Sequence, residues 1–349
     1  MLIVMTRLSS WLGAILLLIT APIFASADNN NSQKFIERKD VQSFIEQMAQ
    51  KHAFDRRQLT QSLARAQIQP KIIATMSKPA EKLPWHQYEG IFLTPQRINA
   101  GVKFWEKNGP SLVKAQKQYG VPPEIIVAII GVESFYGRQA GQFKVLDALV
   151  TLGFDYPPRA PFFLSELEAF LLLAREEKWD PAQIKGSYAG AMGDPQFMPS
   201  SYRQFAVDFT GKGKRDLINN IDDAIGSVAH YFKAHGWETG QPVIFPAKVN
   251  GEQYKNVLAA KANPKPAYTL KQMTQSGVQA SAELTLSPNS PQLFALIGLE
   301  NKQGPEYWLG TQNFYTITRY NHSDHYAMAV YNLSQKIKLA YHQPPTSIY

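Results

Sequence analysis

The sequence predicts a mainly helical α+β protein, and three observations favour this fold class. Apolar residues recur at helical spacing through most of residues 34–237. Strand-like residues between Gly, Pro and Asn breaks are confined to residues 241–318. Helical spacing then returns at residues 323–341. With 349 residues, 44% of them hydrophobic and 18% charged, the chain can bury a sizeable core and form two or three domains.

Residues 1–27 have the pattern of a signal peptide. Arg7 precedes an apolar run at residues 11–24, and Ala25-Ser-Ala27 then forms an A-x-A cleavage signal. The run is shorter than the ~20 apolar residues of a membrane-spanning helix, so we expect cleavage; an uncleaved anchor is the alternative. We therefore expect a periplasmic protein that begins with a polar linker at residues 28–33 and is not a transmembrane protein after cleavage.

Composition narrows the classes of partner. The sequence contains no cysteine, so it has no disulfide framework and no cysteine that could carry a lipid. Its formal net charge of +8 favours anionic polymers such as peptidoglycan, anionic lipid surfaces or nucleic acid. No block of Lys and Arg of the kind that marks nucleic-acid binding is present, so we expect no nucleic-acid partner.

Residues 34–100 predict an N-terminal helical domain. Its clearest amphipathic helix carries four apolar residues on one face: Val41, Phe44, Ile45 and Met48. Four prolines divide the rest into several shorter helices: Pro70, Pro79, Pro84 and Pro95.

Residues 101–240 and 319–349 predict a second helical region, interrupted by a small β-sheet at residues 241–318. Within this region we expect helices at residues 123–137, 162–178, 223–235 and 323–341. Strands are expected at residues 242–246, 280–286, 293–299 and 315–318.

The helix expected at residues 123–137 carries one carboxylate, Glu133, at the end of an almost wholly apolar run. Pro122 and Pro123 suit the helix start and Gly137 suits its C-cap. Burial and the negative end of the helix dipole both disfavour charge in the last turn, so we expect Glu133 to hold a proton near neutral pH. Cleavage of a glycosidic bond needs such an acid. An ion-paired or solvent-facing glutamate is the structural alternative.

Residues 186–202 form a second unusual segment, with three glycines and a run of small residues that allow close backbone approach. Ser187, Tyr188 and Gln196 are able to bind sugar hydroxyls or N-acetyl groups. A tight turn between helices is the alternative, and without a partner motif it is favoured.

Read together, four ordered motifs resemble the lytic murein transglycosylase B family. They are G-V-E-S-F-Y-G at residues 131–137, S-Y-A-G-A-M-G-D-P-Q-F-M-P-S-S-Y at 187–202, the helix D-D-A-I-G-S-V-A-H-Y-F-K-A-H-G-W at 222–237, and I-T-R-Y-N-H-S at 317–323. The resemblance covers residues 34–341. It implies a lysozyme-like catalytic core at residues 101–240 and 319–349, with no cofactor.

The resemblance also implies the reaction. Glu133 would be the sole general acid/base that cleaves the β-1,4 bond between N-acetylmuramic acid and N-acetylglucosamine in peptidoglycan. The muramoyl 6-hydroxyl would attack C1 and give a 1,6-anhydro product without consuming water. Glycan strands are the expected substrate, proteins of cell-wall synthesis or division are candidate partners, and we expect a monomer.

The matched positions imply a set of substrate-binding residues. Ser187, Gln196, Tyr320 and Asn321 would line the binding cleft. Tyr188, Phe197 and Met198 would face the sugar or, equally, pack in the core, since aromatic and Met side chains are commonly buried. Arg159 would bind a peptide or lactyl carboxylate, with an exposed loop arginine as the alternative.

Three alternatives to this interpretation stay open. Asp194 is an unusual acid beside the expected cleft, and it would favour water attack by a muramidase if it faced the anomeric carbon; a turn-forming role is the other interpretation. A non-catalytic peptidoglycan-binding protein is the second alternative. His322 and His325 could present two zinc ligands, but no third ligand accompanies them.

The segment at residues 208–214 matches the position of a calcium loop in some members of the family. Asp208 and Thr210 would supply oxygen ligands, but Lys212 places an ammonium where a third oxygen is needed. We therefore predict no tight calcium site and no metal.

Overall fold

The computed structural model describes residues 33–76, 83–287 and 290–343. Its contacts divide the chain into two compact units, with the boundary between Ala64 and Arg65. The expected signal peptide and all but the last residue of the expected linker lie outside the described residues. Among the described residues, no helix is long and apolar enough to cross a membrane.

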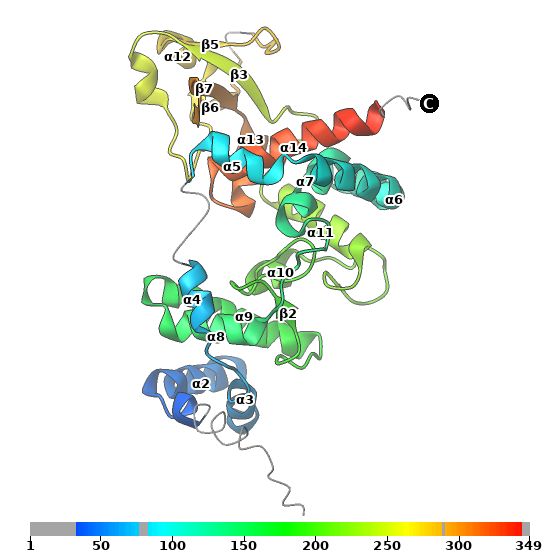
Figure 1. Ribbon diagram of the computed structural model, residues 1–349, viewed down its shortest axis with the longest axis vertical. Coiled ribbons are helices and arrows are strands. Elements are labelled where there is room, and N and C mark those ends of the chain that lie inside the picture. Colours follow the sequence, from blue (N-terminus) through cyan, green and yellow to red (C-terminus); the bar gives the residue numbers. More distant parts are fainter. Residues whose placement is uncertain (1–32, 77–82, 288–289, 344–349) are drawn as a thin grey trace, which may run out of the picture. The chain divides into compact units, whose positions relative to one another are not determined.

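The smaller unit contains α2 (Lys39–His52) and α3 (Arg56–Leu63), drawn in blue in Figure 1. Helix α2 buries Val41, Phe44, Ile45 and Met48, which confirms the face predicted from their spacing. The side chain of Asp55 accepts a hydrogen bond from the Gln58 N–H and so caps the start of α3.

The larger unit is mainly helical, which confirms the predicted fold class. Its helices are α4 (Pro70–Met76), α5 (Trp85–Phe92), α6 (Pro95–Tyr119), α7 (Pro123–Ser134), α8 (Val145–Asp155), α9 (Ala160–Glu176), α10 (Pro199–Phe205), α11 (Ile221–Ala234), α12 (Leu270–Gln275), α13 (Gln312–Tyr320) and α14 (Asp324–His342), with 3-10 turns at Pro157–Arg159 and Gln253–Val257 (Figure 1). The predicted helices at residues 162–178, 223–235 and 323–341 correspond to α9, α11 and α14.

A five-stranded antiparallel sheet lies within the predicted range of residues 241–318. Its spatial order is β4-β6-β7-β3-β5, built from β3 (Ile244–Val249), β4 (Tyr268–Thr269), β5 (Val278–Ala280), β6 (Leu293–Asn301) and β7 (Gly304–Gly310). A separate two-stranded pair joins β1 (Phe143–Lys144) to β2 (Lys185–Gly186). The predicted limits of the domains stay predictions.

Two strand predictions were wrong. Residues 315–318 belong to α13, where Thr311 caps the helix start by accepting from the Asn313 N–H, and the face that holds Thr316 and Ile317 is buried. Packing of this face outweighs the strand preference of β-branched residues. Of residues 280–286 only Ala280 is in a strand, because β5 ends after its pairing with Ala247.

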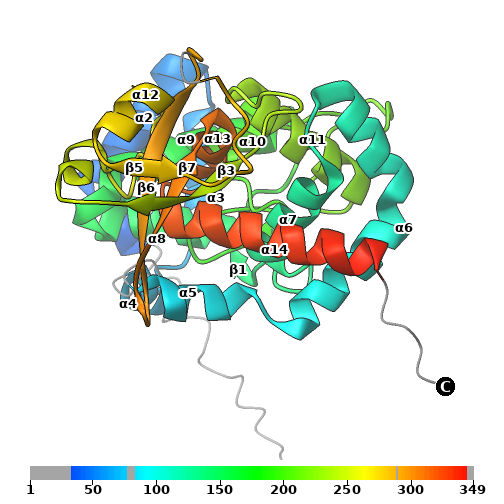
Figure 2. The same cartoon turned by 90° about the horizontal axis from the view of Figure 1, so that it is seen from above.

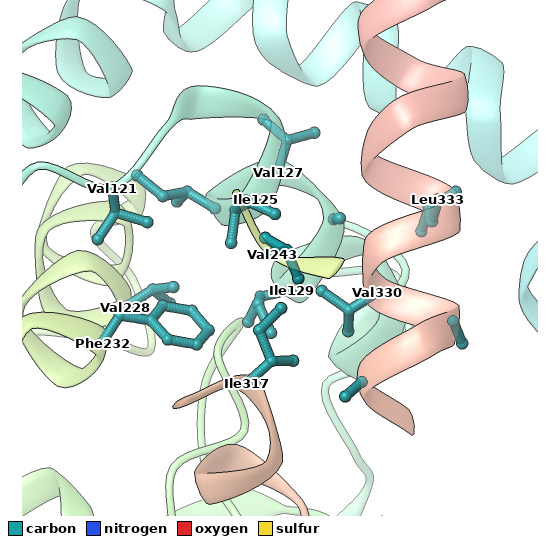
Figure 3. Packing of buried hydrophobic residues seen from close by; sticks show 14 of the residues in the cluster. Val121, Ile125, Val127, Ile129, Val228, Phe232, Val243, Ile317, Val330 and Leu333 are labelled. Carbon is teal, nitrogen blue, oxygen red and sulfur yellow. The ribbon is translucent and has the colours of Figure 1, made fainter. Parts of the chain in front are cut away.

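Helix α7 is the centre of the main hydrophobic core. Its residues 125–130 are almost completely buried and pack against α6, α11 and α14. Figure 3 shows Ile125 and Ile129 beside Phe232 of α11, Ile317 of α13 and Val330 of α14. In Figure 2 α14 runs alongside α7. A helix buried on all sides has few ways to shift, so its C-terminal end is held firmly in place.

Candidate active site

Helix α7 ends in a left-handed turn that begins two residues after Glu133. Ser134 is the last helical residue, and Phe135, Tyr136 and Gly137 have φ values of 51°, 59° and 82°. The predicted C-cap at Gly137 therefore lies two residues too late, because Phe135 is the cap. Left-handed backbone is strained for residues other than glycine, and such strain concentrates at functional sites.

Tyr136 fixes this turn by packing back on the helix. Its hydroxyl donates to the Arg97 carbonyl oxygen at 3.1 Å. A Cβ on either Gly131 or Gly101 would lie 2.5 Å from that hydroxyl oxygen. Only glycine at these two positions leaves room for the Tyr136 side chain.

Three tyrosines interact electrostatically with Glu133, one each from α11, α13 and α14; Tyr231 and Tyr326 are buried and Tyr320 is half-buried. The Tyr326 hydroxyl donates a hydrogen bond to Oε1 of the half-buried Glu133. Burial raises the pKa of Tyr231, Tyr320 and Tyr326, and the negative charge of Glu133 raises it further. The three phenols therefore stay protonated, and Tyr326 remains a hydrogen-bond donor to the carboxylate.

Two of the predicted site residues, Ser187 and Gln196, hold the glycine-rich segment at residues 186–202 in its conformation through hydrogen bonds. Ser187 follows β2, and its Oγ accepts the N–H groups of Ala189 and Ala191 at 3.2 and 3.0 Å. Gln196 has φ 50°, and its Nε2 donates to the carbonyl oxygens of Ala140, beyond the end of α7, and Gly193 at 2.9 and 2.8 Å. The amide of Gln196 thus ties this segment to the residues that follow Glu133.

Tyr320 joins a third part of the chain to the same place. Its hydroxyl donates to the Pro195 carbonyl oxygen at 2.6 Å, and its ring stacks on that of Tyr326 at a centroid distance of 6.5 Å. Asn321, the C-cap of α13, is half-buried beside it. The structure therefore brings Glu133, Gln196 and Tyr320 together through hydrogen bonds and ring contacts, with Ser187 shaping the same loop.

The remaining predicted binding residues differ in exposure. Tyr188 is exposed and Met198 is half-buried. Phe197 is only 2% exposed and lies against the rings of Tyr231 and Tyr320, which favours the packing interpretation that the sequence left open.

Arg159 is exposed in the 3-10 turn before α9. Its guanidinium lies 4.4 Å from the ring centroid of Phe162 and 5.2 Å from that of Phe163. These contacts are local, so they do not connect Arg159 to Glu133.

Asp194 packs on the backbone of the turn after α7. A Cβ on Gly137 would lie 2.8 Å from Asp194 Oδ1. Burial raises the pKa of this carboxyl group. A second acid is thus present near the end of α7, which keeps the hydrolytic alternative open to experiment.

Hydrogen bonds to the carboxylates of Asp208 and Asp223 hold the loop at residues 208–214 in its conformation. Asp208 accepts the N–H groups of Lys212 and Gly213 at 3.0 and 2.6 Å. The Thr210 hydroxyl donates to Asp208 at 3.4 Å and to Asp223 at 3.3 Å. Among the residues that the structure describes, no group of three or more His, Cys, Asp or Glu is placed to hold a metal ion.

His322 and His325 do not share one environment. His325 is 4% exposed and packs against the rings of Trp85 and Tyr88, at centroid distances of 5.8 and 5.6 Å, whereas His322 is exposed. The pair is therefore split between core and surface.

Sequence reasoning missed Tyr326 and Tyr231. Tyr326 lies three residues beyond Ser323, which caps α14 by accepting from the Tyr326 N–H at 3.2 Å. Its nearness in sequence to Tyr320 and Asn321 was a usable signal. Tyr231 lies on the buried face of α11 within a motif that was recognised as a whole, and nothing in the spacing distinguishes it from a core residue.

Comparison with known proteins assigns the family. Residues 37–335 match the family model described as the transglycosylase SLT domain. The chain belongs to this family. It is 45% identical over 320 residues to membrane-bound lytic murein transglycosylase B of Escherichia coli K12, which covers 88% of this chain and 84% of that protein.

Two solved structures of lytic transglycosylases are similar in sequence and fold. SltB1 of Pseudomonas aeruginosa, solved in a catenated form, is 46% identical with a TM-score of 0.81, and the match covers 87% of this chain and 98% of that chain. Slt35 of Escherichia coli, solved in complex with calcium, is 46% identical with a TM-score of 0.78, and the match covers 88% and 96%. These matches confirm the resemblance stated from the four motifs and the lysozyme-like, mainly helical fold.

Proposed function

We propose that Glu133 is the only general acid/base of this chain, which acts as a lytic transglycosylase on peptidoglycan. The class of enzyme and its peptidoglycan substrate follow from the family and from the lytic murein transglycosylase 45% identical to this chain. The assignment of roles to residues rests on the geometry around Glu133.

Protonated Glu133 gives its proton to the oxygen of the β-1,4 bond between N-acetylmuramic acid and N-acetylglucosamine, and that bond breaks. The resulting carboxylate then takes the proton of the muramoyl 6-hydroxyl, whose oxygen bonds to C1. The product is a 1,6-anhydromuramoyl end. No water is consumed, so the second carboxylate that most glycosidases need is not required.

The hydrogen bond from Tyr326 to Glu133 is the observation that carries this proposal. A phenol that stays protonated supports the carboxylate when the proton has left. Glu133 is only half-buried at the end of α7, so a substrate oxygen can reach it. The same group is thereby suited to both steps.

A muramidase that uses Glu133 with water is the second candidate. Asp194 supports it, because this carboxyl group lies against Gly137, four residues beyond Glu133. If Asp194 directs water to C1, Asp194→Asn will change the ratio of hydrolysed to anhydro ends.

Substrate contacts and location complete the proposal. Ser187, Tyr188, Gln196, Met198, Tyr320 and Asn321 are proposed to bind the glycan, with Phe197 packed behind them and Arg159 on a peptide carboxylate. The chain is proposed to be exported to the periplasm by a cleaved signal peptide, to carry no lipid because it has no cysteine, and to act as a monomer. Proteins of cell-wall synthesis or division are its proposed partners.

Digestion of peptidoglycan sacculi, with products identified by mass spectrometry, tests the proposal. We expect anhydromuropeptides from the wild type and an about 1,000-fold lower rate from Glu133→Gln, since the variant loses the proton that the leaving oxygen needs. Glu124→Gln is the matched control, because Glu124 lies at the other end of α7 in an ion pair with Lys338 at 2.8 Å. Reducing ends from the wild type would instead establish a muramidase, and binding without products would establish a non-catalytic protein.

A further inference from the structure

Arg97 is a buried cation near the start of α6, and it makes no ion pair within the described residues. It is 9% exposed, and its Nε has no hydrogen-bond partner in that part of the chain. Burial lowers the pKa of Arg97, but an arginine side chain stays charged at neutral pH. Desolvation of a charge without a counter-charge is costly, so this placement needs an explanation.

Two aromatic rings and a helix end hold the Arg97 guanidinium. It lies 5.1 Å from the ring centroid of Phe92 and 4.9 Å from that of Phe135, within the range of cation–π attraction. Its Nη1 donates to the Ile91 carbonyl oxygen at 2.7 Å, at the C-terminal end of α5. One side chain therefore joins the end of α5 to the turn after α7.

The same residue holds the next position of that turn through its backbone. The Tyr136 hydroxyl donates to the Arg97 carbonyl oxygen at 3.1 Å. Phe135 and Tyr136 are the two non-glycine residues in left-handed conformation that directly follow Ser134. Residue 97 thus contacts both strained residues, one through the guanidinium and one through the main chain.

We propose that Arg97 is a positioning residue that sets the orientation of Glu133 by clamping Phe135 and Tyr136 at the end of α7. Glu133 lies two residues before Phe135, so a relaxed turn would unwind the last turn of the helix and move the carboxyl group. This inference rests on the proposed role of Glu133.

Steady-state kinetics on soluble glycan fragments test the inference with Arg97→Met. We expect kcat to fall about 10- to 100-fold while KM stays within about twofold, since misplacement of the acid affects reaction more than binding. Lys114→Met is the matched control, because Lys114 lies on the same helix and its Nζ is 4.1 Å from the ring centroid of Phe209. The control is expected to keep wild-type kcat.

A double-mutant cycle tests the route of action. Phe135→Leu is expected to lower kcat as Arg97→Met does, and the double variant to be no slower than the slower single variant. Wild-type kcat in a folded Arg97→Met protein, or additive losses in the double variant, would overturn the proposal. If Arg97→Met does not fold, Phe135→Leu decides by the same kcat criterion. Glu133→Gln is measured in parallel: an active Glu133→Gln would refute the proposed function itself, independently of Arg97.

Discussion

Carboxylates are held in opposite ways at the end of α7 and in the first turn of α11. Glu133 accepts a hydrogen bond from the side chain of Tyr326. Asp223 is fully buried and accepts four hydrogen bonds, from the N–H groups of Phe209, Thr210 and Asp216 and the Thr210 hydroxyl. A carboxylate saturated by backbone donors can only hold a loop together, whereas one supported by a side chain keeps the capacity to exchange a proton.

The largest effect expected from this comparison is on stability. Asp223→Ala leaves three backbone N–H groups without their acceptor, so we expect a loss of about 3 kcal/mol in the free energy of unfolding. Chemical denaturation measures it. Activity at 20–25 °C, in the fraction that remains folded, is expected to be unchanged. A large loss of kcat in folded protein would break the comparison.

Asp324 is an intermediate case that sharpens the comparison. It is 4% exposed, its Oδ1 accepts the His325 N–H at 2.8 Å, and burial raises its pKa to about 6. Because the folded state binds the proton of Asp324 more tightly than the unfolded state does, the contribution of this group to stability is fully present at low pH. It is expected to fall by up to about 3 kcal/mol as pH rises from about 4 to above 6.

Asp324→Asn should remove this part of the pH dependence and make the protein more stable than the wild type at pH 7. Thermal unfolding from pH 4.5 to 7.5 measures both. If the melting temperatures of the two proteins change with pH in the same way, ionisation of Asp324 does not destabilise the folded state.

Removal of the donor to Glu133 tests the catalytic side of the comparison. Tyr326→Phe loses one hydrogen bond to a carboxylate, so we expect an about tenfold lower kcat. The lost bond favoured the charged form of Glu133, so the pH above which activity falls should rise. Tyr331→Phe on the same helix is the control. An unchanged pH profile in Tyr326→Phe would mean that Tyr326 only packs against Glu133.

The smallest effect is expected from chelation. The carboxylate of Asp208 already accepts the N–H groups of residues 212 and 213, and Lys212 adds a positive charge to the loop. Because both features disfavour a bound calcium ion, EDTA should change neither activity nor melting temperature. Lys212→Asp supplies a third side-chain oxygen, and calcium should then raise the melting temperature of this variant alone. A lower melting temperature of the wild type in EDTA would contradict the prediction.

Much of the local structure could be predicted because it depends on nearby residues. The spacing of Val41, Phe44 and Met48 indicated the buried face of α2, and Pro123 the start of α7. Prediction failed where long-range packing overrides local preference. Residues 315–318 have strand-forming side chains but form a helix, because the face that holds Thr316 and Ile317 is buried. At the start of this helix the Asn313 side chain donates to the carbonyl oxygens of Glu238 and Gln241, more than 70 positions earlier in the sequence.

The sequence by itself determined the mainly helical fold class, the family and the candidate acid, because the period of apolar residues and the motif around Glu133 are local properties of the chain. Only the tertiary structure decided what surrounds that acid. Tyr326 lies 193 positions from Glu133 and Arg97 lies 38 positions before Phe135, and no periodic pattern links such residues. Their contacts arise when α14 and α6 pack on α7, because the burial of these three helices against one another fixes the position of each helix end.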